Sequence, residues 1–136
     1  MIHQFEMTLP NLGRGYHLIT HLIKNKLNDL PEKGLVNIFL THTSAALALN
    51  ENADPSVRED FENIMNKVIP ENIHLYSHTL EGEDDMPAHI KSSIFGQSLT
   101  IPVTNHKLNL GIWQGIYLCE FRNGGERRNI VITVYS

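Results

Sequence analysis

The sequence predicts an α+β protein with a mostly antiparallel or mixed β-sheet, two longer helices and one short helix. Three patterns indicate this class. Apolar residues alternate near both ends of the chain, two inner segments carry apolar residues at helical spacing, and the last forty residues have the pattern of β-structure. No linker or internal repeat divides the 136 residues, so we expect one compact domain over residues 1–136.

The first half of the chain is expected to hold two strands and two helices. Residues 2–9 alternate between apolar and polar side chains, which is typical of a half-buried strand. Residues 15–30 repeat leucine and isoleucine at helical spacing and predict an amphipathic helix. Residues 35–41 are apolar and partly β-branched, as in a buried strand. Residues 55–69 predict the second long helix, because Asp54 precedes a proline in the favoured first helical position.

The second half is expected to be mainly β-structure. Residues 87–95 predict a short helix that Gly96 ends. Residues 98–103 alternate as a strand, and residues 108–122 contain one or two more. The sequence Asn-Gly-Gly that follows is a favourable hairpin turn, so we expect it to lead into a final strand over residues 128–135.

Composition argues against several classes of partner. There are 11 basic and 15 acidic residues, a net charge of −4, whereas a nucleic-acid-binding domain is usually basic. The apolar stretches are far shorter than the roughly 20 residues of a membrane-spanning helix, and the first residues do not resemble a secretory signal. Cys119 is the single cysteine, which excludes an internal disulfide. We therefore expect a cytoplasmic domain that binds neither nucleic acid nor a membrane.

Three histidines are candidates for a metal site. His42 follows a predicted strand, His78 precedes an acidic loop, and His89 lies on the short helix. Three protein ligands and one open position are the arrangement of a catalytic zinc site. Zinc is the expected ion, and magnesium is the alternative because the acidic run 81–85 offers oxygen ligands. The competing interpretation is three polar histidines that hydrogen-bond to the backbone or to solvent.

Charged residues suggest further roles, each with a structural alternative. Asp54 can cap a helix or act as a catalytic carboxylate. Glu120 and Arg122 lie two residues apart and therefore on one face of a strand. They can form a modest ion pair, or Glu120 can move a proton while Arg122 binds a phosphate through two hydrogen bonds. Lys91 and Ser92 could add phosphate donors.

Three long segments resemble the signature of the YjbQ-like family, which is described as secondary thiamine-phosphate synthases. They read HTSAALALNENADPSVRED, EGEDDMPAHIKSS and WQGIYLCEFR, in this order, and the match covers essentially the whole chain. The resemblance implies a compact α+β fold and a homotrimer. It also implies a metal and anion site at His42, His78 and His89, with Asp54, Glu120 and Arg122 nearby. Ile112 stands where relatives often carry threonine, which changes one substrate contact and removes no ligand.

The resemblance also implies an activity. The expected protein is a metal-dependent enzyme that acts on a small phosphorylated metabolite, with a weak or secondary thiamine-phosphate synthase activity. This transferase reaction joins a pyrimidine pyrophosphate to a thiazole phosphate. A divalent ion, Arg122 and Lys91 would stabilise the departing pyrophosphate. Trp113 and Tyr76 are candidates for a wall along the substrate rings, and Gln114 is a further candidate for substrate binding. A non-catalytic trimeric protein that binds a phosphorylated metabolite and a metal-assisted phosphate-ester hydrolase are the alternatives.

Overall fold

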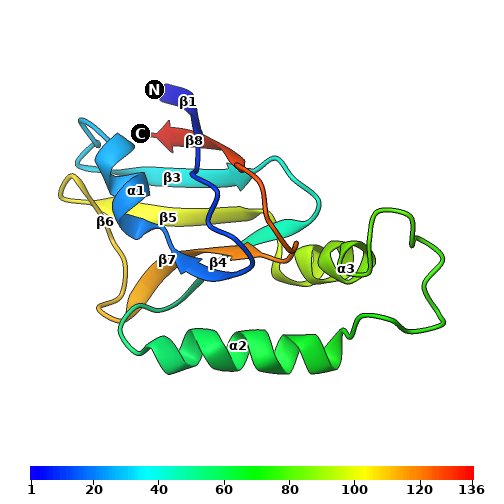
Figure 1. The fold of residues 1–136 in the computed structure, drawn as a ribbon. Helices are drawn as coiled ribbons and strands as arrows, with labels where there is room; N and C mark the ends of the chain where they lie inside the picture. The colour runs from blue at the N-terminus through cyan, green and yellow to red at the C-terminus, as the bar shows by residue number, and fades with distance from the viewer.

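The protein has an α+β fold with three helices and eight strands in two sheets, in a computed structural model that describes residues 1–136 (Figure 1). The predicted fold class is confirmed. None of the helices has the length and apolar character needed to span a membrane. In chain order the elements are β1 (Ile2–Thr8), β2 (Gly15–Leu18), α1 (Thr20–Lys26), β3 (Lys33–Leu40), β4 (Ala45–Glu51), α2 (Pro55–Val68), α3 (Asp85–Phe95), β5 (Ser98–Thr104), β6 (Lys107–Leu108), β7 (Gln114–Glu120) and β8 (Asn129–Tyr135).

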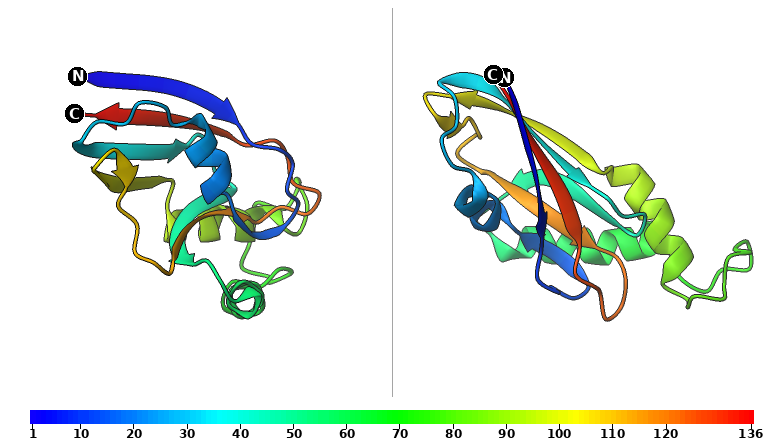
Figure 2. Two further views of the ribbon diagram at one scale, coloured as in Figure 1. Left: turned by 90° about the vertical axis from the view of Figure 1, so that its left-hand side faces the viewer. Right: turned by 90° about the horizontal axis from the view of Figure 1, so that it is seen from above.

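The two sheets are stacked, and all their neighbouring strands are antiparallel. The larger sheet has the order β1-β8-β3-β5-β6, and the smaller has the order β2-β7-β4. Helix α2 runs along the outer side of the smaller sheet, while α3 lies at one end of the molecule (Figures 1 and 2). The smaller sheet is therefore the middle layer between the larger sheet and α2.

Burial along β7 explains why this strand is almost entirely apolar. Ile116 and Leu118 belong to the main core between the two sheets. Tyr117 and Cys119 point the other way, into a second apolar cluster that Phe61 of α2 helps to cover. A strand buried on both faces reads as a continuous apolar run. Burial also raises the pKa of the Cys119 thiol, as expected for a packed side chain rather than a reactive one.

Six predicted elements are confirmed with small changes at their ends: β1, β3, β5, β8, α2 and α3. The start of α2 has the expected cap, because the carboxylate of Asp54 accepts a hydrogen bond from the backbone N–H of Ser56 at 2.9 Å. Helix α3 ends at Gly96 as predicted, where the backbone is left-handed with φ +96°.

The predicted helix over residues 15–30 is wrong in its first part. Residues 15–18 form β2, which pairs with β7, and the helix covers only residues 20–26. Tyr16 lies in an aromatic cluster with Phe61, Phe95 and Phe121, and an extended backbone places its ring there. Tertiary packing therefore overrides the helical spacing of the leucines.

Strand β4 was not predicted. Its sequence AALALNE is rich in alanine, which has a low preference for strands. Ala45 and Ala46 are fully buried, because β4 lies against β7 and α3 also packs on this region. Small side chains suit this close approach, and the sequence pattern alone does not show it.

The predicted hairpin at residues 123–125 is also wrong. Strands β7 and β8 belong to different sheets, so the segment 121–128 carries the chain from one layer to the other. Gly124 and Gly125 do adopt left-handed conformations, with φ of +75° and +58°. The turn chemistry was therefore identified correctly, but the strands on either side do not pair with each other.

Candidate metal centre

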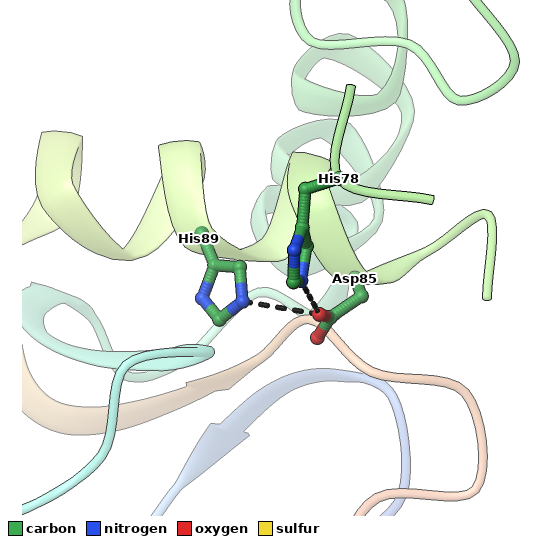
Figure 3. Close-up of side chains that lie close together, drawn as sticks. All are labelled: His78, Asp85 and His89. Atoms are coloured by element: carbon green, nitrogen blue, oxygen red, sulfur yellow. Dashed lines mark hydrogen bonds and ion pairs between the residues drawn. The ribbon is translucent and has the colours of Figure 1, made fainter. Parts of the chain in front are cut away.

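Two of the three predicted histidines meet at a carboxylate. His78, Asp85 and His89 each offer one ligand atom, and these atoms lie within 4.8 Å of one another (Figure 3). His78 comes from the long loop between α2 and α3. Asp85 is the first residue of α3, and His89 follows one turn later on the same helix. The helix starts two residues earlier than predicted, and this places Asp85 and His89 at i and i+4, on one face.

The carboxylate of Asp85 is the centre of this cluster. Its Oδ2 lies 2.6 Å from Nε2 of His78 and 3.1 Å from Nε2 of His89, while Oδ1 accepts a hydrogen bond from Nη1 of Arg122 at 2.5 Å. Only 4% of the Asp85 side chain is exposed. Burial favours the neutral acid, but the hydrogen bond from His78 and the charges of Arg122 and His89 outweigh it, so the pKa of Asp85 is lowered. Asp85 is therefore an anion that faces two imidazoles.

The backbone determines which nitrogen of His89 carries hydrogen. Nδ1 of His89 lies 2.9 Å from the carbonyl oxygen of Thr43, and a carbonyl can only accept a hydrogen bond. Nδ1 must therefore be the N–H donor. In the neutral ring Nε2 then has a lone pair, which is directed at the oxygen of Asp85. Two acceptors that face each other require a cation between them, either a proton or a metal ion.

Arg122 holds the acidic turn next to the cluster and is not free to bind a phosphate. Its Nε donates to Asp84 at 2.8 Å, Nη1 donates to Asp85, and Nη2 donates to the carbonyl oxygen of Glu81 at 3.0 Å. The predicted phosphate contact is therefore replaced by contacts with acidic residues of the same chain. The effect of these contacts is to orient Asp85 toward the two histidines.

Glu120 takes part in a buried ion pair and does not lie in the cluster as a proton-transfer group. Its oxygens accept hydrogen bonds from Nε of Arg128 at 2.7 Å and from Nη2 at 2.5 Å. The side chains of Glu120 and Arg128 are 1% and 0% exposed. Arg128 also donates to Ser44, and the backbone N–H of Arg122 donates to Glu120. The carboxylate has no access to solvent, so the structure gives it a role in packing.

His42 lies outside the cluster, and its nitrogens are engaged elsewhere. Nε2 accepts a hydrogen bond from the backbone N–H of Asn129 at 2.8 Å. Nδ1 lies 3.2 Å from the guanidinium of Arg128 and 3.5 Å from the carboxylate of Glu126. Burial and the charge of Arg128 lower the pKa of His42, although Glu126 acts in the opposite direction. In the cluster, Asp85 occupies the place that the sequence assigned to His42.

The lowered pKa of His42 predicts a dependence of stability on pH. Below pH about 6.5, the ordinary pKa of histidine, His42 is protonated in the unfolded chain but still neutral in the folded chain. The free energy of unfolding therefore decreases as the pH is lowered, until the pH passes the pKa of His42 in the folded state. The slope from this group is at most about 1.4 kcal/mol per pH unit. Urea unfolding between pH 7.5 and 5 should show a smaller loss for His42→Gln than for the wild type. Equal losses of stability in His42→Gln and the wild type would contradict a lowered pKa of His42.

A cavity of about 440 Å³ adjoins the cluster. His42 and His89 both line it, and most of the other lining residues carry hydroxyl or amide groups. The complete set is Phe39, Leu40, Thr41, His42, Thr43, His89, Ser92, Ser93 and Gln97. Ser92 is nearly buried, and its hydroxyl donates to the carbonyl oxygen of Ala45 at 2.7 Å. His42 and His89 thus share a cavity, although they do not share a ligand position.

Two other predicted site residues face away from the cluster. Asp54 is an exposed helix cap, and the hydrogen bond from the backbone of Ser56 lowers its pKa. Lys91 is 2% exposed, with Nζ 3.2 Å from Asn66 and 5.1 Å from the centre of the Phe121 ring. It follows His89 by two residues, which places it on nearly the opposite face of α3.

Trp113 and Gln114 lie at the far end of β7. Gln114 begins the strand and Glu120 ends it, so about 20 Å of extended chain separates them. Trp113 is 62% exposed, and the side-chain oxygen of Gln114 accepts a hydrogen bond from the backbone N–H of Gly111. The structure therefore does not bring these two residues to the cluster.

Comparison with known proteins identifies the family. The sequence model of the family described as "UPF0047 protein YjbQ-like" matches residues 5–136. The UPF0047 protein YjbQ of Salmonella typhimurium is 51% identical over 98% of both chains, and that of Escherichia coli O157:H7 is 47% identical over the same shares. A conserved hypothetical protein from Thermus thermophilus has a similar crystal structure, with a TM-score of 0.83 and 30% identity over 94% of this chain and 97% of that chain.

The comparisons correct the expected function. A second similar structure, from Sulfolobus solfataricus, is described as a YjbQ-like protein of unknown function; it has a TM-score of 0.83 at 21% identity, over 98% of this chain and 96% of that chain. The relatives carry only the UPF0047 designation. The expectation of a metal-dependent thiamine-phosphate synthase acting on a phosphorylated metabolite is therefore wrong on these findings. The sequence matches and the shared fold together establish that the chain belongs to the YjbQ-like family, UPF0047.

Proposed function

We propose that this protein binds one divalent transition-metal ion, with zinc as the expected ion, through His78, Asp85 and His89. The observation that carries the proposal is the hydrogen bond between Nδ1 of His89 and the carbonyl oxygen of Thr43. Histidines that bind metals usually donate their other ring N–H to such an acceptor, which directs the free lone pair at the ion. Arg122 orients Asp85 in a similar way, because it donates a hydrogen bond to Oδ1 while Oδ2 faces the histidines.

The spacing of the ligand atoms supports an ion of this size. In a tetrahedral zinc site with bonds of about 2.0–2.1 Å, ligand atoms lie about 3.3 Å apart. The two nitrogen–oxygen distances here are 2.6 and 3.1 Å, and all three ligand atoms lie within 4.8 Å of one another, so the side chains must shift slightly to surround an ion. Two imidazoles favour zinc over magnesium, which prefers oxygen ligands. Iron(II) also binds two histidines and a carboxylate, so it belongs in the same titration.

Three protein ligands leave a position for a water molecule or a small ligand. Structural zinc sites usually have four protein ligands, whereas catalytic sites have three and lower the pKa of a bound water. The imidazole of His78 is 47% exposed and that of His89 is 31% exposed, so the centre is open to solvent. The arrangement therefore fits a centre that activates water or binds a small molecule in the neighbouring cavity.

Removal of one imidazole tests the proposal. The wild type should bind one zinc ion per chain in a competition titration with a chromophoric chelator. His78→Ala should weaken binding by at least about tenfold, by analogy with the loss of groups that merely support metal ligands. His74→Ala is the matched control, because His74 is an exposed histidine of the same loop, outside the cluster. Equal zinc affinity in both variants would reject the proposed centre.

The oligomeric state stays a prediction. Leu75 and Leu80, on the loop that also carries His78, are 87% and 97% exposed. Association between copies would cover such side chains, and this supports an oligomer, of which the homotrimer is the expected form.

A further inference from the structure

A second cavity lies at the end of the molecule opposite the metal centre. It has a volume of about 430 Å³, within the range of small-molecule pockets, and it lies between the end of α1 and the β5–β6 turn. In Figures 1 and 2 these elements lie at the end away from α3. The cavity is therefore independent of the histidine cluster and of the proposed function.

The lining of this cavity combines positive charge with an apolar wall. Its residues are Lys24, Leu27, Leu30, His106, Lys107 and Leu108. The three leucines are partly buried and pack against the main core. No carboxylate lines the cavity, and neither lysine takes part in an ion pair of this chain. Two exposed lysines without an ion-pair partner therefore line a cavity that has an apolar wall.

The walls of the cavity are joined by hydrogen bonding. Nδ1 of His106 donates to the carbonyl oxygen of Leu30 at 2.8 Å, which links the β5–β6 turn to the loop after α1. Asn105 and His106 both have left-handed backbones, with φ of +50° and +65°. Such a two-residue turn fits the twist of a hairpin. The turn and its hydrogen bond thus place Lys107 and Leu108 opposite the end of α1 before any ligand arrives.

We propose that this cavity binds a small amphipathic anion, with its charged group between Lys24 and Lys107 and its apolar body against the leucines. A medium-chain carboxylate has this chemistry. Charge complementarity selects an anion, because both ammonium groups lack a partner in the chain. The leucines select an apolar body, because contact with it removes their remaining exposed surface from water.

Titration with octanoate, followed through backbone amide NMR shifts, tests the site in the full chain. Octanoate should give saturable shifts at Leu27, Leu30 and Leu108. Octanol lacks the charge and acetate lacks the chain, so both should be much weaker. Equal binding of octanol or of acetate would overturn the proposal, and so would octanoate shifts confined to other residues.

Charge variants separate this site from general attraction. Lys24→Gln or Lys107→Gln should weaken octanoate binding about threefold, and the double variant about tenfold, as expected for partly exposed ion pairs. Lys67→Gln is the matched control, because Lys67, like Lys24, is an exposed lysine in the last turn of a helix. It should leave binding unchanged. If the same lysines instead bind vesicles of anionic phospholipid while octanoate has no effect, the cavity is part of a membrane-facing surface and the proposal fails.

Discussion

Asp85→Asn is expected to weaken zinc binding by more than about a hundredfold, beyond the effect of losing a group that only supports a ligand. The substitution removes the anionic ligand and replaces it with a neutral amide. The carboxylate of Asp85 contacts both histidines, so its loss affects two of the three pairs in the cluster. Competition with a chelator of known affinity measures the change directly.

The control for this variant is Asp60→Asn, which changes an exposed carboxylate of α2 by the same chemistry. Asp60→Asn should retain the zinc affinity of the wild type. Both proteins should show the same far-ultraviolet circular dichroism, because Asp85 occupies the first turn of α3 and does not build the core. Wild-type affinity in a folded Asp85→Asn protein would show that the ion binds elsewhere or not at all.

Arg128→Met should lower the free energy of unfolding by about 3–5 kcal/mol, the usual cost of breaking a buried ion pair from one side. The guanidinium of Arg128 is fully buried and satisfies both oxygens of Glu120. Without it, the carboxylate stays in the interior without its charged partner. Urea unfolding monitored by tryptophan fluorescence measures the loss.

Two further variants test this explanation. Arg127→Met alters the exposed neighbour of Arg128 and should change stability by less than about 0.5 kcal/mol. The double variant Arg128→Met with Glu120→Leu removes both charges and should recover part of the stability, because an apolar pair of similar size avoids the desolvation cost. A small effect of Arg128→Met alone would indicate that water reaches Glu120.

The sequence was informative where a single face of a strand or helix determines the pattern. The strands β1, β3, β5 and β8 alternate because one side packs on the main core, and α2 carries a recognisable cap at Asp54. The pattern fails for residues 15–18 and 45–51, because these strands are in contact with structure on both sides or rely on small residues. The sheet to which a strand belongs depends on partner strands distant in the chain, and the spacing of apolar residues does not reveal these partners.

The candidate site was found in part for a related reason. The sequence predicts His78 and His89 as ligands, but it offers the acidic run next to them only as oxygen ligands for magnesium. A start of α3 at Asp85 instead of residue 87 would have placed Asp85 and His89 on one face. The contacts of His42 and Glu120 with Arg128 could not be anticipated, because they join residues from three separate strands and loops.

The three ligands come from a helix and from a loop, so a bound ion would connect α3 to the loop between α2 and α3. Asp85 and His89 are held by a helix, whereas His78 lies on an exposed part of the loop, between Tyr76, which donates to the carbonyl oxygen of Pro70, and Glu81, whose carbonyl accepts from Arg122. An ion bound to His78 would fasten this loop to α3, and its departure would release it. Cleavage of the loop by a protease would then report metal occupancy in the intact protein, without any assay of activity.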